Sequence, residues 1–286
     1  MLVTNRDDRY FDASERVIKL YNGFVIQGTS TPASWWSEVA AEASSGSLRM
    51  LELFPPLTST NAAETGSGSF ISDLKDISVW WVNLDQWHWS QMVLSAAELS
   101  RAHRFHFELD RRRFVASRSA LRILLARCVN GDAEALAFDT GKYGKPHLRQ
   151  YGDFHFNLTH SHDLAGVAVT REGPIGLDCE RIQEMSDFRS LCERICSSDE
   201  LDIMSRHGSE RCVELFFRAW TRKEAILKAL GLGLSFPPNT LTVLSWPEAT
   251  QLRIEVPGHG AWWVSTLNVP PGYAAACCTP FRIELQ

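Results

Sequence analysis

The feature of this sequence that most constrains its fold is a weak internal repeat. The segment FVASRSALRILL, from Phe114, and the segment AWTRKEAILKAL, from Ala219, both have the spacing of basic amphipathic helices and lie about 105 residues apart. Two strand-like segments, VAVT from Val167 and ACCT from Ala276, repeat at about 109 residues. The similar offsets predict two related α+β halves packed side by side, and the cleft between such halves is the natural place for a ligand.

The chain divides at a polar stretch near its N-terminus. Residues 58–69, TSTNAAETGSGS, have the Ser, Thr and Gly content of a flexible linker. The segment ISVWWVNL, from Ile77, then has the β-branched and aromatic content of a strand. We therefore expect an N-terminal extension and linker over residues 1–75, a first half over 76–172 and a second half over 173–286.

Local signals predict the elements within the halves. Ser95 and Glu98 have the spacing of a capping box that opens a helical region, interrupted in places, up to residue 127. A long helix from about Cys212 to residue 230 should end at Gly231. Short helices are expected near 188–195 and 199–205. Strands are expected at 23–27, 154–158, 166–170 and 175–179, and near residues 240, 252, 262, 274 and 282.

Composition excludes several classes of protein. The chain has no run of about 18 apolar residues and no basic and apolar leader, so neither a membrane span nor secretion is expected. Seven cysteines without paired CxxC spacing fit a reducing cytoplasm better than a disulfide framework or a zinc module. The net charge of −5 argues against general nucleic-acid binding.

One local basic patch lies within the first predicted helical region. Eight arginines fall between Arg101 and Arg127. We expect most of them to form a solvated face paired with Glu108 and Asp110, and a few to gather an anionic ligand.

Two acidic residues mark the end of an apolar strand, in the motif Gly176-Leu-Asp178-Cys-Glu180. Side chains alternate along a strand, so Asp178 and Glu180 should share a face, about 7 Å apart. Two carboxylates on one face repel each other unless a cation lies between them, and oxygen ligands of this kind suit Mg²⁺. A solvent-facing rim is the alternative explanation for an isolated pair.

Three further motifs are weak when taken singly. Glu224 and Lys228 are four residues apart on the long helix, which by itself indicates only a helix-stabilising ion pair. Residues 157–163, NLTHSHD, are interpreted as a polar loop after a strand, whose hydroxyls, imidazoles and amides could hold phosphates. A zinc site through His160 and His162 would lack further ligands nearby. The segment 143–147, YGKPH, indicates a turn.

The order of these motifs is more specific than any one of them. GKP, FNLTHS, GLDCE and FFRAWTRKEAILKALGLGL occur in the order found in the Sfp-type 4'-phosphopantetheinyl transferases, and the chain resembles that family over about residues 77–286. The resemblance implies an α+β fold of two similar, pseudo-symmetric halves in a monomer, with coenzyme A and Mg²⁺ in the cleft. It also implies transfer of 4'-phosphopantetheine from coenzyme A to a serine hydroxyl of an apo acyl or peptidyl carrier protein, releasing adenosine 3',5'-bisphosphate.

The resemblance also implies site residues. The magnesium-binding acids would be Asp178, Glu180 and Glu224. Lys228 would stabilise or protonate the leaving group, and either Glu224 or a water on the metal would take the serine proton. The positions that match coenzyme A contacts of the family are Arg101, Arg113, Lys145, Thr159, His160, Lys223 and Lys228.

The match includes a branch-specific motif and two departures from the family pattern. Trp220, Lys223, Glu224 and Ala225 match the branch of the family that often serves polyketide and nonribosomal peptide synthases. Cys179 stands where the family usually has an aliphatic residue and Thr159 where Ser is commoner, and both changes preserve size and role. The alternative is a non-catalytic module that binds coenzyme A or a carrier protein; it predicts a missing acid or lysine, and none is missing.

Overall fold

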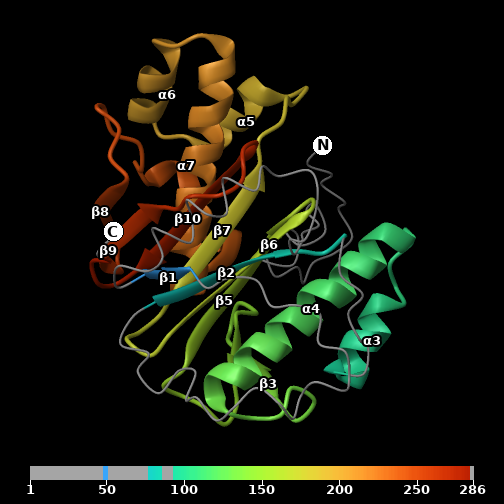
Figure 1. Ribbon diagram of the computed structural model, residues 1–286. Helices are drawn as coiled ribbons and strands as arrows, with labels where there is room; N and C mark the ends of the chain where they lie inside the picture. Colours follow the sequence, from blue (N-terminus) through green and yellow to red (C-terminus); the bar gives the residue numbers. More distant parts are fainter. Residues whose placement is uncertain (1–47, 51–76, 86–92, 284–286) are drawn as a thin grey trace.

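The computed structural model describes residues 48–50, 77–85 and 93–283 (Figure 1). The strand expected at 23–27 lies outside these residues, as does most of the expected extension. The helices are α3 (Ala96–Ala102), α4 (Glu108–Val129), α5 (Phe188–Ile195), α6 (Ser198–Ser205) and α7 (Ser209–Leu230). The strands are β1 (Leu48–Met50), β2 (Ile77–Asn83), β3 (Phe138–Thr140), β4 (Pro146–Leu148), β5 (His155–Ser161), β6 (Leu164–Thr170), β7 (Gly176–Arg181), β8 (Gln251–Val256), β9 (Gly260–Thr266) and β10 (Tyr273–Thr279).

The strand order confirms two similar α+β halves. One sheet has the order β1-β2-β6-β5 and the other β7-β10-β9-β8, while β3 and β4 form a separate pair. In each half a first strand (β2 or β7) precedes a 22-residue helix (α4 or α7), and the last strand (β6 or β10) pairs antiparallel with the first. The segments β2-β6-β5 and β7-β10-β9 are therefore equivalent, as the internal repeat predicted.

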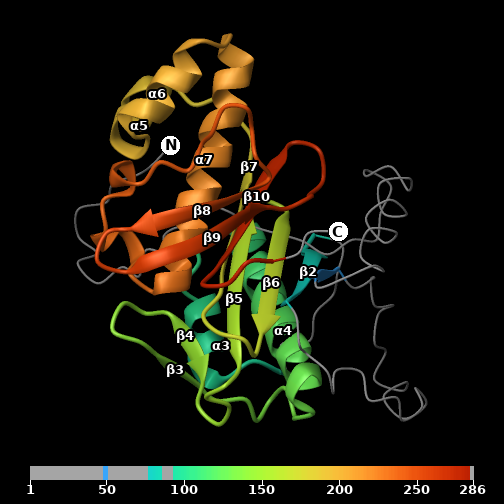
Figure 2. The same cartoon turned by 90° about the vertical axis from the view of Figure 1, so that its left-hand side faces the viewer.

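Each half has its own core, and a third core joins them. Helix α4 packs on the first sheet, with Leu121 and Leu125 against Trp80 and Val167, and α7 packs on β7, β9 and β10 (Figure 2). The opposite faces of the two sheets meet in a third cluster of buried side chains, which includes Ile77, Val79, Trp81, Leu177, Cys179, Ala275 and Cys277. Alternation along β2 and β7 thus divides their side chains between a helix-covered core and the core between the halves.

The two sheets adjoin along β5 and β7 without a shared backbone ladder. Hydrogen bonds join positions 157 to 177, 159 to 179 and 161 to 181, so the strands run parallel at a constant offset of 20 residues. In each bond a backbone N–H of β7 donates to a side-chain oxygen of β5. At the junction between the halves, side-chain oxygens therefore accept the hydrogen bonds that backbone carbonyl oxygens accept within a sheet.

The helix boundaries follow local signals closely. Ser95 and Glu98 form the expected capping box at the start of α3. Helix α7 ends at Gly231, whose φ of 68° lies in the left-handed region that glycine adopts without strain. It begins at Ser209, three residues before the expected start at Cys212. No helix in the described ranges is long and apolar enough to cross a bilayer.

Three sequence-based expectations about strands need correction. The strand expected near residue 240 is wrong, because Pro238–Thr240 is a 3-10 turn and the prolines at 237 and 238 cannot donate to a ladder. The strand expected near residue 282 is also wrong, since residues 281–283 follow Pro280 without strand pairing. Conversely, Leu48–Met50 lies within the expected extension yet pairs parallel with β2, which adds an edge strand to the first sheet.

Candidate active site

The acidic residues of β7 lie on the side of the strand that faces helix α7. Leu177 and Cys179 point into the core between the halves. The intervening residues, Asp178 and Glu180, contact side chains of α7 instead, as described below. The sequence-based prediction that the two carboxylates share a face is therefore confirmed, and the alternative of a solvent-facing rim is wrong because both residues are 0% exposed.

A glycine lets α7 lie unusually close to β7. A Cβ atom at Gly176 would be 1.9 Å from the carbonyl oxygen of Ala225 and 2.5 Å from the amide nitrogen of Ala229. No side chain fits between the strand and the helix at this point. The close approach brings the polar stripe of α7 onto the carboxylates of β7.

That stripe consists of Trp220, Glu224 and Lys228, which are spaced four residues apart and so share one face of the helix. Lys228 Nζ donates to Asp178 Oδ1 at 2.6 Å. At the other end of the stripe, Trp220 Nε1 donates to Glu180 Oε1 at 3.1 Å. We call Asp178, Glu180, Glu224 and Lys228 the acid cluster.

The charges of the acid cluster do not balance. Three carboxylates are buried beside one ammonium group, and Glu224 is only 2% exposed. Burial, and then the charge of Asp178, raise the pKa of Glu180 well above its usual value. Burial also raises the pKa of Asp178, although the neighbouring Lys228 ammonium opposes the shift. Burial alone would lower the pKa of Lys228, but Asp178 and Glu224 outweigh it and raise this pKa, so the ammonium stays charged at neutral pH.

The acid cluster has the donor chemistry of a divalent-cation site. Among the residues that the structure describes, Asp178 Oδ2 is a buried oxygen with no hydrogen-bond partner. Carboxylate oxygens are the ligands that Mg²⁺ prefers, and a dication would neutralise the excess negative charge. No group of three His, Cys, Asp or Glu side chains in the described ranges has its atoms in ligating geometry. The fit of the acid cluster to a metal thus rests on the chemistry and charge of its residues.

The segment interpreted as a phosphate-binding loop is a strand. Residues 155–161 form β5, and only the turn after Ser161 lies outside it. Thr159 Oγ1 donates to Asp178 Oδ1 at 3.1 Å, and Ser161 Oγ donates to Glu180 Oε2 at 3.2 Å. The polar composition suggested a loop because the sequence does not show that this strand lies buried against the second sheet. Thr159 thus belongs beside the acids.

His160 lies on the opposite face of β5 from Thr159. Strand alternation places it with Phe156 and Leu158, which belong to the core under α4, and its side chain is buried. The structure therefore does not bring Thr159 and His160 together as one loop. A ligand that contacts both would have to reach both faces of the strand edge.

The remaining cations expected near coenzyme A are held in different parts of the fold. Lys145 Nζ donates at 2.9 Å to the carbonyl oxygens of Ile175 and Ala229, so this lysine of the first half binds the start of β7 and the end of α7. Burial lowers the pKa of Lys145 to about 8. Arg113, on α4, forms an ion pair with Asp85. Arg101 lies over the ring of Phe114, 5.2 Å from its centroid.

The basic face of α4 is less solvated than expected. Arg122 is 2% exposed, and its guanidinium donates to Glu98 Oε2 at 2.7 Å and to two backbone carbonyl oxygens. Arg118 also forms an ion pair with Glu98. Arg111 pairs with Glu108 as expected. The expectation of a solvated face is therefore wrong for Arg122, which ties α3 to α4.

Lys223 does not lie in the acid cluster. Its ammonium donates to Glu200 Oε2 at 2.5 Å and to the carbonyl oxygen of Ile195 at 2.7 Å, and both charged side chains are fully buried. Glu200 also accepts from the amides of Ser197 and Val243. We call Lys223 and Glu200 the anchor pair, because it ties α7 to α6 and to the segment before β8. Lys223 thus binds the end of α5 and the carboxylate of α6 in these two bonds.

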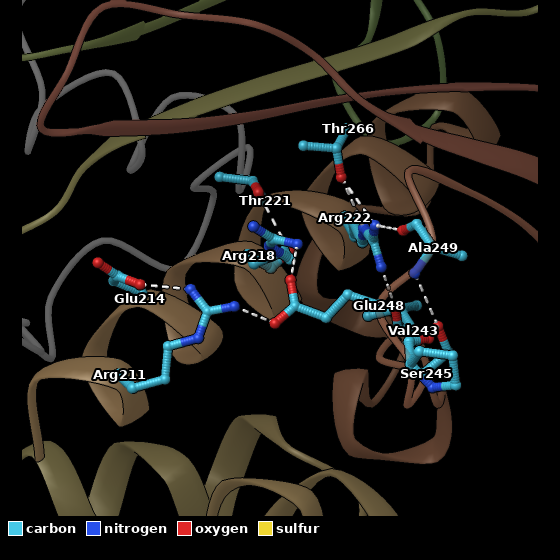
Figure 3. Close-up of polar contacts among 11 residues, drawn as sticks. Arg211, Glu214, Arg218, Thr221, Arg222, Val243, Ser245, Glu248, Ala249 and Thr266 are labelled. Atoms are coloured by element: carbon cyan, nitrogen blue, oxygen red, sulfur yellow. Dashed lines mark hydrogen bonds and ion pairs between the residues drawn. The ribbon is translucent and has the colours of Figure 1, made fainter. Parts of the chain in front are cut away.

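Arg222 anchors the same stretch of helix on another side. Figure 3 shows its guanidinium directed at the carbonyl oxygens of Val243 and Ala249 and at the hydroxyl of Thr266. Arg211 and Arg218, nearer the start of α7, converge on Glu248 in the same view. Arg222 is fully buried, and burial lowers its pKa to about 10. It was missed in the sequence because its partners are backbone carbonyls far along the chain.

Two further residues of the site were missed. Trp220 was used only as a motif residue, although its position four residues before Glu224 places it on the same stripe. Ser161 was passed over as part of the supposed loop. The signal for Ser161 was the alternating pattern Asn157, Thr159 and Ser161, which in a strand puts three polar side chains on one side.

Comparison with known proteins identifies related sequences over both halves. Residues 174–278 match the model of the 4'-phosphopantetheinyl transferase superfamily, and residues 78–172 match the N-terminal model of a 4'-phosphopantetheinyl transferase. The chain is 33% identical over 187 residues to the 4'-phosphopantetheinyl transferase psf-1 of Bacillus pumilus, which covers 65% of this chain and 78% of the relative. It is 38% identical over 171 residues to the 4'-phosphopantetheinyl transferase HetI of a Nostoc species, covering 56% and 70%.

A third relative is more distant in identity but similar in extent. The 4'-phosphopantetheinyl transferase Sfp of Bacillus subtilis is 28% identical over 186 residues, which cover 65% of this chain and 81% of the relative. The match to the superfamily model contains the whole acid cluster, and the match to the N-terminal model contains Thr159 and Ser161. The residues that meet at the junction of the halves thus come from both matched segments.

Proposed function

The chain belongs to the 4'-phosphopantetheinyl transferase superfamily, and we propose that it transfers 4'-phosphopantetheine from coenzyme A to a serine hydroxyl of an apo acyl or peptidyl carrier protein. It would act as a holo-acyl-carrier-protein synthase type of enzyme and release adenosine 3',5'-bisphosphate. A non-catalytic binding module is not supported, because the relatives are named as transferases and no acid or lysine of the motif set is missing.

The observation that carries the proposal is the excess of buried carboxylate in the acid cluster. Three acids beside one lysine are a poor structural element, because buried charges that lack partners destabilise a fold. They become useful if a divalent cation and an anionic substrate complete the charge balance. The diphosphate of coenzyme A supplies such an anion. We propose that Asp178, Glu180 and Glu224 hold Mg²⁺, which when bound neutralises the diphosphate and polarises its phosphorus centres.

The reaction exchanges one phosphorus–oxygen bond for another. The serine oxygen of the carrier protein attacks the β-phosphorus of coenzyme A, and the bond from that phosphorus to the bridging oxygen breaks. The electron pair of that bond stays on the phosphate of adenosine 3',5'-bisphosphate. The serine proton passes to a base, for which we propose the Glu224 carboxylate, since it lies on the same face of α7 as Lys228.

Lys228 is proposed to serve the leaving group. Its raised pKa keeps the ammonium charged at neutral pH, so it can donate a hydrogen bond to the oxygen on which negative charge develops. In the structure this ammonium is held by Asp178 Oδ1. Its position on the same stripe as Glu224 allows one helix to present both groups to a single phosphate.

Other residues of the proposed coenzyme A site are contributed mostly by the first half. We propose that Lys145 lies at the nucleotide end, that Arg113 and Arg101 face the phosphates, and that His160 borders them, while Thr159 stays with the acids. For Lys223, the structural role of the anchor pair replaces the phosphate contact suggested by resemblance. The first half would then bind the nucleotide while the second half carries the acids.

The partner and setting are also proposals. The Trp-x-x-Lys-Glu-Ala form at residues 220–225 favours carrier domains of polyketide or nonribosomal peptide synthases. We propose a monomer that works in the cytoplasm, without nucleic-acid or membrane partners.

A direct test is the intact mass of a carrier domain. Purified protein is incubated with CoA, MgCl₂ and, separately, an apo peptidyl carrier domain or an apo acyl carrier protein. The proposal expects a mass gain of one phosphopantetheine on at least one of them, lost when the acceptor serine is changed to alanine. Unmodified carriers in every reaction, beside a working control transferase, would contradict the proposed function.

A further inference from the structure

Three polar side chains on one side of β5 bridge the two halves, and they are not equivalent. Each accepts a backbone N–H of β7: Asn157 Oδ1 from Leu177 at 2.7 Å, Thr159 Oγ1 from Cys179 at 3.2 Å and Ser161 Oγ from Arg181 at 2.8 Å. This shared bond holds the sheets together. A junction that only stabilised the fold would need no further hydrogen bond from these three side chains.

The two hydroxyls also donate to the acids, whereas the amide has no acid to contact. Thr159 donates to Asp178 and Ser161 donates to Glu180, in each case the residue just before the β7 amide that it accepts. The residue before Leu177 is Gly176, which has no side chain. The same two-bond unit is therefore repeated at the two acids and is incomplete at Asn157.

Each of these hydroxyls has its hydrogen bonds fixed in direction. A hydroxyl has one proton and two lone pairs. When the backbone N–H of β7 occupies a lone pair, the proton is left to point at the carboxylate. All hydrogen-bonding positions of the Thr159 hydroxyl are occupied, because its second lone pair accepts from Lys228 Nζ at 3.4 Å. Hydroxyls of the first half, oriented by the backbone of β7, thereby orient the charged side chains of that same strand.

As a result, one carboxylate oxygen of Asp178 accepts hydrogen bonds and the other is left available for a ligand. Asp178 Oδ1 accepts from both Thr159 and Lys228, while Oδ2 is buried and has no hydrogen-bond partner among the described residues. Glu180 is fixed at both ends, by Ser161 on Oε2 and by Trp220 on Oε1. Both acids are fully buried, away from bulk solvent.

We propose that Thr159 and Ser161 are positioning residues that orient Asp178 and Glu180 for the metal, an inference that rests on the proposed function. Their hydroxyls act on the metal through the acids and form no contact with the reacting atoms. Partners that orient ligating carboxylates typically change metal affinity by about 10- to 100-fold when removed. Asn157 makes the same bridge without an acid, so it separates the positioning role from the structural one.

The experiment measures Mn²⁺ binding to the full-length protein saturated with CoA, without carrier protein, by the electron paramagnetic resonance of free Mn²⁺. The variants are Thr159→Val, Ser161→Ala and Asn157→Ala, each of which removes one bridge. We expect all three to lower the melting temperature of the metal-free protein. Only Thr159→Val and Ser161→Ala should also weaken Mn²⁺ binding, by about 10-fold or more. Thr159→Ser keeps the hydroxyl and should restore wild-type affinity.

Three outcomes would overturn the inference. Wild-type Mn²⁺ affinity in Thr159→Val and Ser161→Ala would show that the hydroxyls only bridge the sheets. An equal loss in Asn157→Ala would show that metal affinity follows the junction as a whole. A loss of CoA affinity in Thr159→Val, with Mn²⁺ affinity kept, would make Thr159 a phosphate contact. Failure of the proposed function is a separate result, because the wild-type protein itself would then bind no Mn²⁺ or leave every carrier unmodified.

Discussion

Helix α7 carries two buried charge clusters on neighbouring residues, and they differ in how completely their charges are satisfied. In the anchor pair, one ammonium faces one carboxylate, and Glu200 also accepts two backbone amides. In the acid cluster, three carboxylates face one ammonium, and Asp178 Oδ2 has no hydrogen-bond partner among the described residues. Both clusters are buried to a similar degree, so exposure does not distinguish them.

The difference separates stability from function. A buried pair whose hydrogen bonds are complete holds elements together, and removing one member leaves a buried charge alone. A buried cluster with excess charge of one sign is held in place by the rest of the fold and gains its balance from a ligand. We therefore propose opposite roles for Lys223 and Glu224, which are adjacent in sequence. Three substitutions and one pH comparison test this division.

Asp178→Asn should abolish transfer while leaving the fold intact. The change keeps the shape of the side chain but removes a charged metal ligand, and a loss on the order of 10³-fold in kcat is expected for a group that balances transition-state charge. The melting temperature should stay the same or rise slightly, because repulsion with Glu180 is relieved and Lys228 keeps Glu180 and Glu224 nearby. Carrier modification and thermal melts measure the two effects. Full turnover at saturating CoA would remove Asp178 from the metal site.

Glu200→Gln should have the reverse pattern. It leaves the Lys223 ammonium buried without a carboxylate, and breaking such a pair costs about 3 kcal/mol of unfolding free energy. Urea unfolding should show this loss. At a temperature where the variant is still folded, kcat should stay within a few-fold of wild type, since the acid cluster is unchanged. A kcat that falls as far as in Asp178→Asn, in folded protein, would mean that the anchor pair takes part in the reaction.

Gly176→Ala should affect both clusters together. The added Cβ would meet the Ala225 carbonyl oxygen, so α7 must move away from β7. We expect a loss of about 2 kcal/mol in unfolding free energy, the scale of overpacking, together with lower kcat. Gly208→Ala is the matched control, because a Cβ there meets nothing within 4 Å. Equal stability and activity of Gly176→Ala and wild type would contradict the close approach.

The metal-free protein should show a pH dependence that comes from the acid cluster. The pKa values of Asp178 and Glu180 are raised above their usual 3.8 and 4.5, so the folded state binds these protons more tightly than the unfolded state. Their contribution is most favourable at low pH and is lost as the pH rises through the raised values. Relative to the Asp178→Asn, Glu180→Gln double variant, wild type in EDTA should therefore gain unfolding free energy as the pH is lowered from 7.5 to 5.5. Unfolding free energies that change in parallel for both proteins would contradict the pKa shifts.

Local patterns predicted much of this fold because local physics determines it. Strand alternation put Asp178 and Glu180 on one face, the capping box began α3, and Gly231 ended α7. The internal repeat gave the two halves, because equivalent helices and strands need equivalent apolar spacing. These features depend only on residues close in sequence.

The features that sequence reasoning missed depend on contacts between distant segments. Residues 157–163 were interpreted as a loop, because the polar side chains of Asn157, Thr159 and Ser161 find their partners on β7, 20 residues away. Lys223 was expected at the phosphates, although it is about 100° around the helix from Glu224, and its partner Glu200 lies on α6. Arg122 was not distinguished from the arginines expected in solvent, because its acceptors on α3 and in the loop after α4 are not marked by any local pattern.

The central claim is that the unbalanced acid cluster binds the metal and CoA, while the anchor pair does not. The most direct measurement is the rise in melting temperature when Mg²⁺ and CoA are added together, compared among wild type, Asp178→Asn and Glu200→Gln. A ligand that binds only the folded state raises stability by mass action. We expect a rise in melting temperature for wild type, a similar rise for Glu200→Gln from its lower starting point, and little or none for Asp178→Asn. An undiminished rise in Asp178→Asn, or its loss in Glu200→Gln alone, would contradict the account.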